Sequence, residues 1–170
     1  DISEIIAYGG ELRHEHKDEV LSAIKAGINT IESSSMGRLF DAVASMLGMG
    51  DENRYEGECA IKLENAAAEA LVHPGRNRAG DLALKFHMDV AAATADGCGQ
   101  AREMTGVNQV ALSGGVFQNK ILMEECLRLL RNMGFSVYYN IAVPTNDGGI
   151  ALGQAFIGLR HLEGQRQPTG

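Results

Sequence analysis

Two pairs of glycines, each followed by a pattern that predicts a helix, are the residues best suited to chemistry in this chain. The first pair, Gly114-Gly115, lies within residues 111–119, and the second, Gly148-Gly149, lies within residues 143–153. Glycine has no Cβ to obstruct a ligand that approaches the backbone. A helix N-terminus just beyond it offers N–H groups and partial positive charge to phosphate or ribose oxygens. Two such turns, each beside Asn or Asp, indicate a nucleotide-binding cleft.

The polar residues next to these pairs are candidates for ligand contact. We place Asn119 one helical turn beyond the first pair, where its amide could bind a ribose or adenine edge; the alternative is a solvent-facing asparagine. Asn146 and Asp147 begin the last predicted helix, and Asp147 could bind a metal ion that bridges to phosphate. Either residue could instead be an N-cap. No Gly-Lys-Ser/Thr follows the first pair, which excludes a Walker A loop.

Two residues nearer the N-terminus could also meet a ligand. Asp41 lies beside an apolar helical stripe, where a partly covered carboxylate could accept hydrogen bonds from a ribose diol. The alternative is an i, i+3 ion pair with Arg38, which would contribute a few tenths of a kcal/mol. Gly57 could let a ligand approach the backbone, or could simply permit a turn.

The spacing of the histidines and cysteines identifies no catalytic residue. His14 and His16 are too close for an i, i+4 metal-binding pair, and we expect them on a surface loop. We expect His87 to pack or to form a hydrogen bond. No Ser-His-Asp or Cys-His arrangement can be recognised from spacing, so the catalytic residues stay unassigned.

Hydrophobic periodicity predicts a helix-rich chain with two short strands. We expect helices over 17–28, from the N-cap serines 33–35 to Gly48, around 60–72, over 80–105 with a kink at Gly97 and Gly99, from the first glycine pair to Gly134, and over 147–162; the strands are expected at 107–112 and 135–139. The resulting division is an unplaced segment 1–16, a helical part 17–106, a part with the strands 107–162, and a frayed tail 163–170.

The order strand, turn, helix, strand predicts a βαβ unit near the C-terminus. Such a unit implies parallel strands and a right-handed crossover. Ligands in sheets of this kind bind at the carboxyl ends of the strands, where the first glycine pair falls. Two or three strands against five or six helices make a thin sheet, so we expect a helix-rich α/β chain that is half of a larger lobe.

Composition limits the class of partner and the compartment. The formal net charge of −7 and the absence of tryptophan argue against a broad nucleic-acid interface. The three cysteines have no C-x-x-C spacing, which favours reduced thiols and a cytoplasmic protein. No apolar run reaches the roughly 18 residues of a membrane span, and the acidic first residues do not resemble a signal peptide.

These stretches resemble the C-terminal part of the hydrogenase-maturation carbamoyltransferase family, HypF. The resemblance covers about residues 25–160, with matches at 27–29, 34–44, 55–57, 86–87, 111–119 and 143–155. It implies a partial actin/Hsp70/sugar-kinase-like (ribonuclease H-like) lobe with a nucleotide bound between two lobes. A more distant resemblance is to the universal tRNA threonylcarbamoyl transferase.

The resemblance also implies an activity and a site. In the family, carbamoyl phosphate and ATP yield a carbamoyl-adenylate, and the carbamoyl group passes to the C-terminal cysteine of the partner protein HypE during nickel–iron hydrogenase maturation. The implied ligands are therefore ATP or carbamoyl-adenylate and a divalent metal ion (Mg, Zn or Fe). Position by position, Asp41 matches the residue near the ribose, Gly57 matches a glycine lining the nucleotide, and Asp147 matches the acidic metal ligand; Gly114, Gly115 and Asn119 match the nucleotide-contacting turn and helix.

The chain also departs from the family pattern. The paired metal-binding histidines, the N-terminal phosphate loop, the zinc-finger motifs, and the acylphosphatase-like and adenylate-forming domains are absent from it. We therefore expect a truncated piece that is inactive alone, that packs against the missing domains of the parent protein, and that self-associates through an exposed apolar face. The alternatives are a lobe of a tRNA threonylcarbamoyl transferase and a non-catalytic helical docking module.

Overall fold

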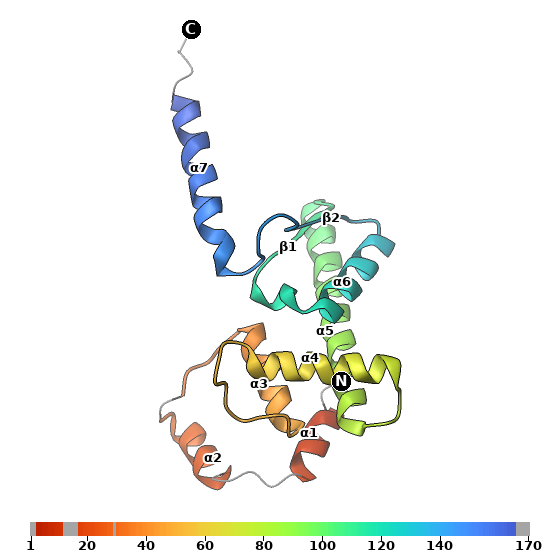
Figure 1. Cartoon of the computed structure of the whole chain (residues 1–170). Helices are drawn as coiled ribbons and strands as arrows, with labels where there is room; N and C mark the ends of the chain where they lie inside the picture. Colours follow the sequence, from red (N-terminus) through yellow and green to blue (C-terminus); the bar gives the residue numbers. More distant parts are fainter. Residues whose placement is uncertain (1–2, 12–16, 29, 166–170) are drawn as a thin grey trace. The chain divides into compact units, whose positions relative to one another are not determined.

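The computed structural model describes residues 3–11, 17–28 and 30–165 as two compact units, 1–92 and 93–170. Unit 1 holds most of the helices, unit 2 holds both strands, and α5 contributes to each unit (Figure 1). The elements in chain order are α1 (Ser3–Glu11), α2 (Lys17–Ala26), α3 (Met36–Met46), α4 (Glu58–Val72), α5 (Arg78–Thr105), β1 (Gln109–Leu112), the 3-10 turn η1 (Gly115–Gln118), α6 (Lys120–Asn132), β2 (Ser136–Tyr139), the 3-10 turn η2 (Asp147–Gly149) and α7 (Ile150–Gln165).

The core of unit 1 forms where α3, α4 and the first half of α5 bury their apolar faces. The ring of Phe40 meets the ring of Phe86 edge-on, with centroids 4.9 Å apart, and meets the ring of His87 at 5.2 Å. Such edge-to-face pairs favour a fixed packing of α3 on α5. The buried apolar residues of α3, α4 and this part of α5 include Phe40, Val43, Ala44, Cys59, Leu63, Ala67, Leu82, Ala83, Phe86 and Val90.

The start of α3 follows from its sequence. The Oγ of Ser35 accepts a hydrogen bond from the N–H of Arg38, which satisfies one of the donors left free at a helix N-terminus. The prediction that a serine caps this helix is therefore confirmed. The expected apolar stripe is confirmed as well, except that Met36 at its start is 40% exposed.

Unit 2 contains the predicted βαβ unit. Strands β1 and β2 are parallel, with Gln109 beside Ser136 and Leu112 beside Tyr139, and α6 makes the connection between them. Helix α6 buries one stripe, Leu122, Cys126 and Leu130. The spacing of these residues places them on one face of a helix, so the crossover helix was readable from the sequence.

The described residues correct several sequence-based boundaries. Helix α1 lies within the segment 1–16 that we left unplaced, and it packs against α3 with Ile5 buried. Helix α5 runs without interruption through Gly97 and Gly99. Helix α7 begins at Ile150, after η2, and extends to Gln165, so residues 163–165 are helical rather than a tail. His14 and His16 lie outside the described residues.

The short length of α1 explains why its pattern was missed. A nine-residue helix that contains Gly9 and Gly10 has weak intrinsic propensity. A Cβ at Gly9 would lie 3.0 Å from the carbonyl oxygen of Met46, which shows how closely α1 approaches α3. Tertiary packing rather than local preference therefore stabilises this helix.

Candidate functional site

The two glycine turns meet at the carboxyl ends of the two parallel strands in unit 2. The N–H of Gly114, just after β1, donates a hydrogen bond of 2.8 Å to the carbonyl oxygen of Thr145, which follows β2 along the chain. A Cβ at Gly115 would lie 3.8 Å from the Cβ of Asn146. The structure therefore brings the first turn against the second, at the edge of the sheet where ligands bind in parallel α/β folds.

Asn119 lies at a different point from the one expected. It is 8% exposed, and its Oδ1 accepts a 2.9 Å hydrogen bond from the N–H of Leu122. It is thus the N-cap of α6 rather than a residue within a helix or a solvent-facing asparagine. The reason is that the first glycine pair opens the 3-10 turn η1, so the α-helix starts five residues after Gly115.

In the second turn, Asn146 and Asp147 have separate roles. The Oδ1 of Asn146 accepts a hydrogen bond from the N–H of Gly148, so the N-cap interpretation holds for Asn146. Asp147 is the first residue of η2 and is exposed. Its position at the turn leaves the carboxylate accessible to a ligand that approaches from solvent.

The backbone donors of three glycines at the site are already used within the chain. The N–H of Gly114 is bonded to Thr145 O, that of Gly148 to Asn146 Oδ1, and that of Gly149 to Asn146 O at 3.0 Å. These three glycine N–H groups are therefore bonded within the chain, whereas the N–H groups expected to meet a ligand are those of the helix N-termini beyond the glycine pairs. The 3-10 turns and the contact between the two loops satisfy donors that an uncapped helix end would leave free.

Different physical constraints act at the glycine positions of the site: some require a glycine backbone conformation, and others leave no room for a Cβ. Gly114 adopts φ 107°, which L side chains rarely adopt. A Cβ at Gly149 would lie 2.7 Å from the carbonyl oxygen of Pro144, which leaves no room for it. Gly115 has no positive φ, and its Cβ would make only the ordinary 3.8 Å contact with Asn146. Neither backbone conformation nor packing among the described residues requires glycine at position 115.

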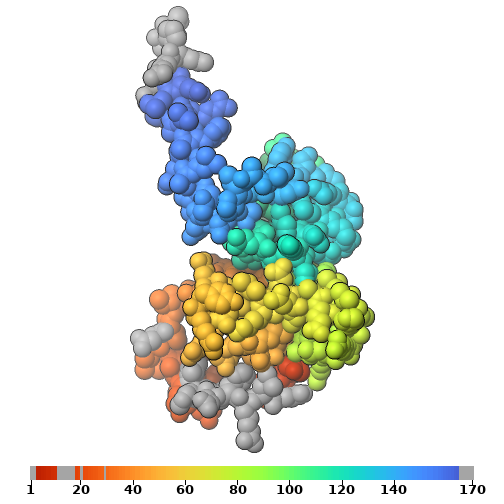
Figure 2. All heavy atoms as spheres, in the orientation of Figure 1, coloured from red at the N-terminus to blue at the C-terminus, as the bar shows by residue number. Residues whose placement is uncertain are grey.

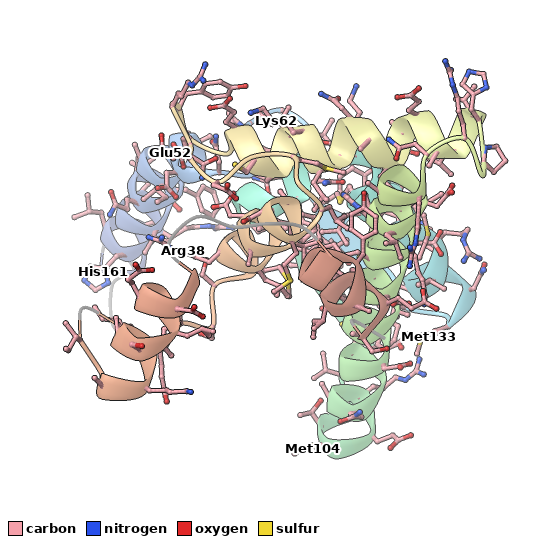
Figure 3. The ribbon with its side chains drawn as sticks, turned by 90° about the horizontal axis from the view of Figure 1, so that it is seen from below. Arg38, Glu52, Lys62, Met104, Met133 and His161 are labelled. Carbon is pink, nitrogen blue, oxygen red and sulfur yellow. The ribbon has the colours of Figure 1, made fainter. Side chains whose placement is uncertain are left out.

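In unit 1, Asp41 has an unsatisfied oxygen. The residue is half-buried on α3, and its Oδ1 is shielded from water without a hydrogen-bond partner among the described residues. Figure 3 labels Arg38 on the same helix, but that side chain does not pair with this oxygen. The i, i+3 ion pair therefore does not explain Asp41 Oδ1. A buried carboxylate oxygen without a partner is costly, so a partner outside the described residues would stabilise it.

Gly57 and Glu58 form the N-terminus of α4 in the same unit. Gly57 is the N-cap residue with φ 77°, and a Cβ there would meet nothing within 4 Å. Glu58 is buried, and it accepts hydrogen bonds from the N–H of Arg54 at 2.8 Å and from the Nζ of Lys62 at 2.7 Å (Lys62 is labelled in Figure 3). Lys62 and the Arg54 N–H lower the pKa of Glu58. Sequence reasoning missed this paired carboxylate, although an acidic residue in a first helical turn is its usual signal.

None of the three cysteine thiols is poised as a nucleophile. Burial raises the pKa of Cys59, and the nearby charge of Asp41 raises it further. Burial also raises the pKa of Cys98, and it raises that of Cys126 to about 11. These thiols stay protonated at neutral pH, and all three are free.

The described residues contain no group of three or more His, Cys, Asp or Glu side chains that could hold a metal ion by themselves. A carboxylate such as that of Asp147 suits Mg²⁺, which proteins bind through one or two carboxylates together with phosphates of the substrate. Across the described helices, none is both long enough and apolar enough to cross a membrane.

A family model described as "Carbamoyltransferase, Kae1-like Domain, second subdomain" matches residues 2–77 and 72–154. Among curated proteins, the carbamoyltransferase HypF of Rhodobacter capsulatus is 36% identical over 157 residues, which cover 81% of this chain and 21% of that protein. A HypF homolog of Cupriavidus necator is 29% identical and is matched over 95% of this chain and 48% of its own length.

Comparison with solved structures also finds similarity to HypF proteins. A crystal structure of full-length HypF in the phosphate- and nucleotide-bound form superposes with a TM-score of 0.76 at 34% identity, covering 96% of this chain and 25% of that one. The crystal structure of T. kodakarensis HypF gives a TM-score of 0.74 at 27% identity, covering 96% of this chain and 26% of that one. The chain thus spans about a fifth to a half of the length of these relatives. It belongs to the HypF carbamoyltransferase family, in which it corresponds to the second subdomain of the Kae1-like domain.

Proposed function

We propose that this chain is the nucleotide-binding lobe of a carbamoyltransferase of nickel–iron hydrogenase maturation, and that it binds ATP or carbamoyl-adenylate. The observation that carries the proposal is the hydrogen bond between Gly114 and Thr145, which joins two ligand-type turns at the carboxyl ends of parallel strands. Gly115 supports it, because nothing among the described residues requires glycine there and a close ligand would. A full-length relative has been crystallised with phosphate and nucleotide.

In the proposed reaction, the carbamoyl group of the adenylate is transferred to the C-terminal cysteine of HypE. The cysteine thiolate attacks the carbamoyl carbon, a C–S bond forms, the C–O bond to the phosphate breaks, and AMP leaves with the electron pair. None of the thiols of this chain suits the attack, which agrees with a nucleophile from the partner. The contribution of the lobe is to position the adenylate and to stabilise charge on the leaving group.

A role is proposed for each candidate residue within its own unit. Asn119 contacts the nucleotide through its amide N–H₂, because its Oδ1 is used as the cap of α6. Asp41 binds the ribose, for which its unsatisfied Oδ1 is the support. Gly57 lines the nucleotide, and the open space at its Cβ position is compatible with that role. Asp147 is one ligand of a divalent cation that also binds phosphate, and its exposed carboxylate is suited to Mg²⁺.

The proposal extends to the complete fold and to its surroundings. We propose that the helical part 17–106 and the strand-containing part 107–162 are the two halves of an actin/Hsp70/sugar-kinase-like lobe. We also propose that the protein is cytoplasmic. Helix α7 would be covered by the other domains of the parent protein. Its support is that residues 150–164 are all exposed although Leu152, Phe156 and Ile157 are apolar.

The test is calorimetric titration of the chain with ATP and Mg²⁺, alongside Asn119→Ser and Asp147→Asn. Serine keeps an oxygen that can cap α6, so Asn119→Ser removes the amide without the loss of stability expected for alanine. We expect weaker binding in Asn119→Ser and a loss of Mg²⁺ dependence in Asp147→Asn. The matched control is Asp96→Asn, an exposed acidic residue on α5, which should bind like the wild type.

Each outcome separates the proposal from its alternatives. If a folded wild-type chain binds no nucleotide, the titration is repeated with the upstream part of the parent protein restored. No binding by that longer chain contradicts the nucleotide-lobe function and favours a docking module. Equal binding by all four proteins contradicts the assigned residues but not the function. A salt-dependent shift of tRNA by the chain would favour the tRNA-modifying alternative.

A further inference from the structure

The hydroxyl of Thr145 is a donor that the described fold does not use. Its Oγ1 is shielded from water and has no hydrogen-bond partner among the described residues, whereas the carbonyl oxygen of the same residue accepts the 2.8 Å bond from Gly114. A buried hydroxyl without a hydrogen-bond partner destabilises the folded chain. The Thr145 hydroxyl is therefore a hydrogen-bond donor next to the first glycine turn that has no partner among the described residues.

Three backbone N–H groups near this hydroxyl are already hydrogen-bonded, so the hydroxyl matters more for binding an anionic ligand. The N–H groups of Gly114, Gly148 and Gly149 are all bonded within the chain. A phosphoryl group at the two turns could recruit these N–H groups only by breaking the bonds that hold the turns together. A side-chain donor that is still unpaired binds an oxygen without that cost.

We infer that Thr145 is a further ligand-binding residue, whose hydroxyl donates a hydrogen bond to a phosphoryl oxygen of the bound nucleotide. The inference rests on the proposed function. It follows from two independent observations, the unpaired Oγ1 and the use of three of the four glycine N–H groups, those of Gly114, Gly148 and Gly149, within the chain. The phosphoryl oxygen is favoured over a ribose hydroxyl because Asp147, the residue proposed to hold the divalent cation, lies two positions along the same turn.

The sequence alone does not single out Thr145. Threonine in a loop after a strand is common, and its hydroxyl usually bonds to nearby backbone. In the same unit, Thr105 shows that ordinary use: its Oγ1 donates to the carbonyl of Ala101 at 2.7 Å and accepts from the N–H of Val107 at 3.2 Å. Thr105 is therefore a matched control for a structural threonine hydroxyl.

The experiment compares wild type, Thr145→Val, Thr145→Ser and Thr105→Val by calorimetric titration with ATP and Mg²⁺, and separately with adenosine. Valine keeps the shape of threonine and removes only the hydroxyl. We expect Thr145→Val to raise the Kd for ATP about tenfold, which is the loss of one charge-assisted hydrogen bond. Thr145→Ser should restore binding, Thr105→Val should bind ATP like the wild type, and adenosine should bind equally to all four.

Thermal unfolding without ligand supplies a second readout. We expect Thr145→Val to unfold at or above the wild-type temperature because it loses no hydrogen bond, whereas Thr105→Val should unfold earlier. Three results overturn the inference: ATP binding unchanged in Thr145→Val, an equal loss for adenosine, or a loss of unliganded stability as large as that in Thr105→Val. If ATP binds neither to the wild type nor to the chain with the upstream part of the parent protein restored, the proposed function fails and this inference fails with it. Binding that is insensitive to Thr145→Val removes only this inference.

Discussion

At the residue scale, the same polar side chains serve the fold and the candidate site. Asn119 and Asn146 each use a side-chain oxygen to cap a helical turn. Asp41 and Thr145 each keep a shielded oxygen without a partner. Capping oxygens lower the cost of ending a helix, whereas unpaired oxygens raise the cost of folding. We therefore regard the second pair as the stronger sign of a ligand, because the fold gains nothing from it.

His87 gives a prediction about pH at this scale. It is fully buried between aromatic rings, and its Nδ1 lies 2.7 Å from the carbonyl oxygen of Ala83. Burial lowers the pKa of His87, against smaller opposing effects of the Ala83 carbonyl and Glu64. Below about pH 6.5 the imidazole of His87 is therefore protonated in the unfolded chain more readily than in the native protein. Stability is expected to fall as the pH falls through that value, by at most about 1.4 kcal/mol per pH unit for this one group.

The measurement is denaturant unfolding of wild type and His87→Gln between about pH 5 and pH 8. The slope of unfolding free energy with pH should be smaller in the variant, because the titrating group is gone. His73→Gln, which changes an exposed histidine at the end of α4, is the control for the loss of a histidine side chain. A slope that is identical in wild type and His87→Gln would show that His87 does not titrate differently in the two states.

At the element scale, short turns rather than long helices determine the geometry of the site. The first glycine pair opens the 3-10 turn η1, the second pair ends the 3-10 turn η2, and one hydrogen bond between Gly114 and Thr145 joins the two loops. Strands β1 and β2 place both loops at the same edge because they run parallel. The helices α6 and α7 begin only after these turns. The elements position the site, and the turns decide which donors stay available.

Two glycine substitutions distinguish a glycine required for packing from a glycine that a ligand approaches closely. In Gly149→Ala the added Cβ would collide with the Pro144 carbonyl at 2.7 Å, so we expect a loss of about 1–3 kcal/mol of stability. In Gly115→Ala the Cβ makes only a 3.8 Å contact, so the fold should tolerate it while nucleotide binding weakens. Denaturant unfolding and ATP titration of both variants check this. Normal ATP binding by Gly115→Ala would argue against a ligand lying over that glycine.

At the scale of the whole molecule, apolar surface on α7 is left without a cover. Leu152, Phe156, Ile157 and Leu159 are each between 57% and 70% exposed, and Figure 2 shows α7 in blue with its atoms open on the face drawn. The apolar side chains of α7 are spread around much of the helix rather than gathered on one face. The two-stranded sheet likewise leaves Tyr138 at 57% exposure, although parallel sheets are normally covered on both faces. Unit 2 is therefore suited to packing against more protein.

We expect the isolated chain to self-associate through α7. Light scattering should give a mass that rises with concentration, because exposed apolar area drives association. The double variant Phe156→Glu/Leu159→Glu should shift the mass toward the monomer. Met104→Glu is the control: Met104 is 85% exposed at the end of α5 (Figure 3), and its replacement should leave the association unchanged. A mass that is strictly monomeric at all concentrations would contradict this prediction.

The sequence by itself determined the elements with strong periodicity and the residues that carry the family pattern. The stripes of α3 and α6 and the parallel βαβ order were predictable because side-chain spacing reports which face is buried. Family membership was also predictable, because the motifs at 34–44, 111–119 and 143–155 are local in sequence. The roles assigned to Asp41, Asn119 and Asp147 stay predictions.

Tertiary structure alone decided the rest. Helix α1 depends on contact with α3, which no local pattern reveals. The capping role of Asn119 depends on where a 3-10 turn ends and an α-helix begins. The bond from Gly114 to Thr145 joins residues 31 positions apart. Three of the four glycine N–H groups at the turns are bonded within the chain, and the Thr145 hydroxyl has no partner among the described residues. Whether a donor is free is a property of everything packed around it, so it cannot be read from residue types and spacing.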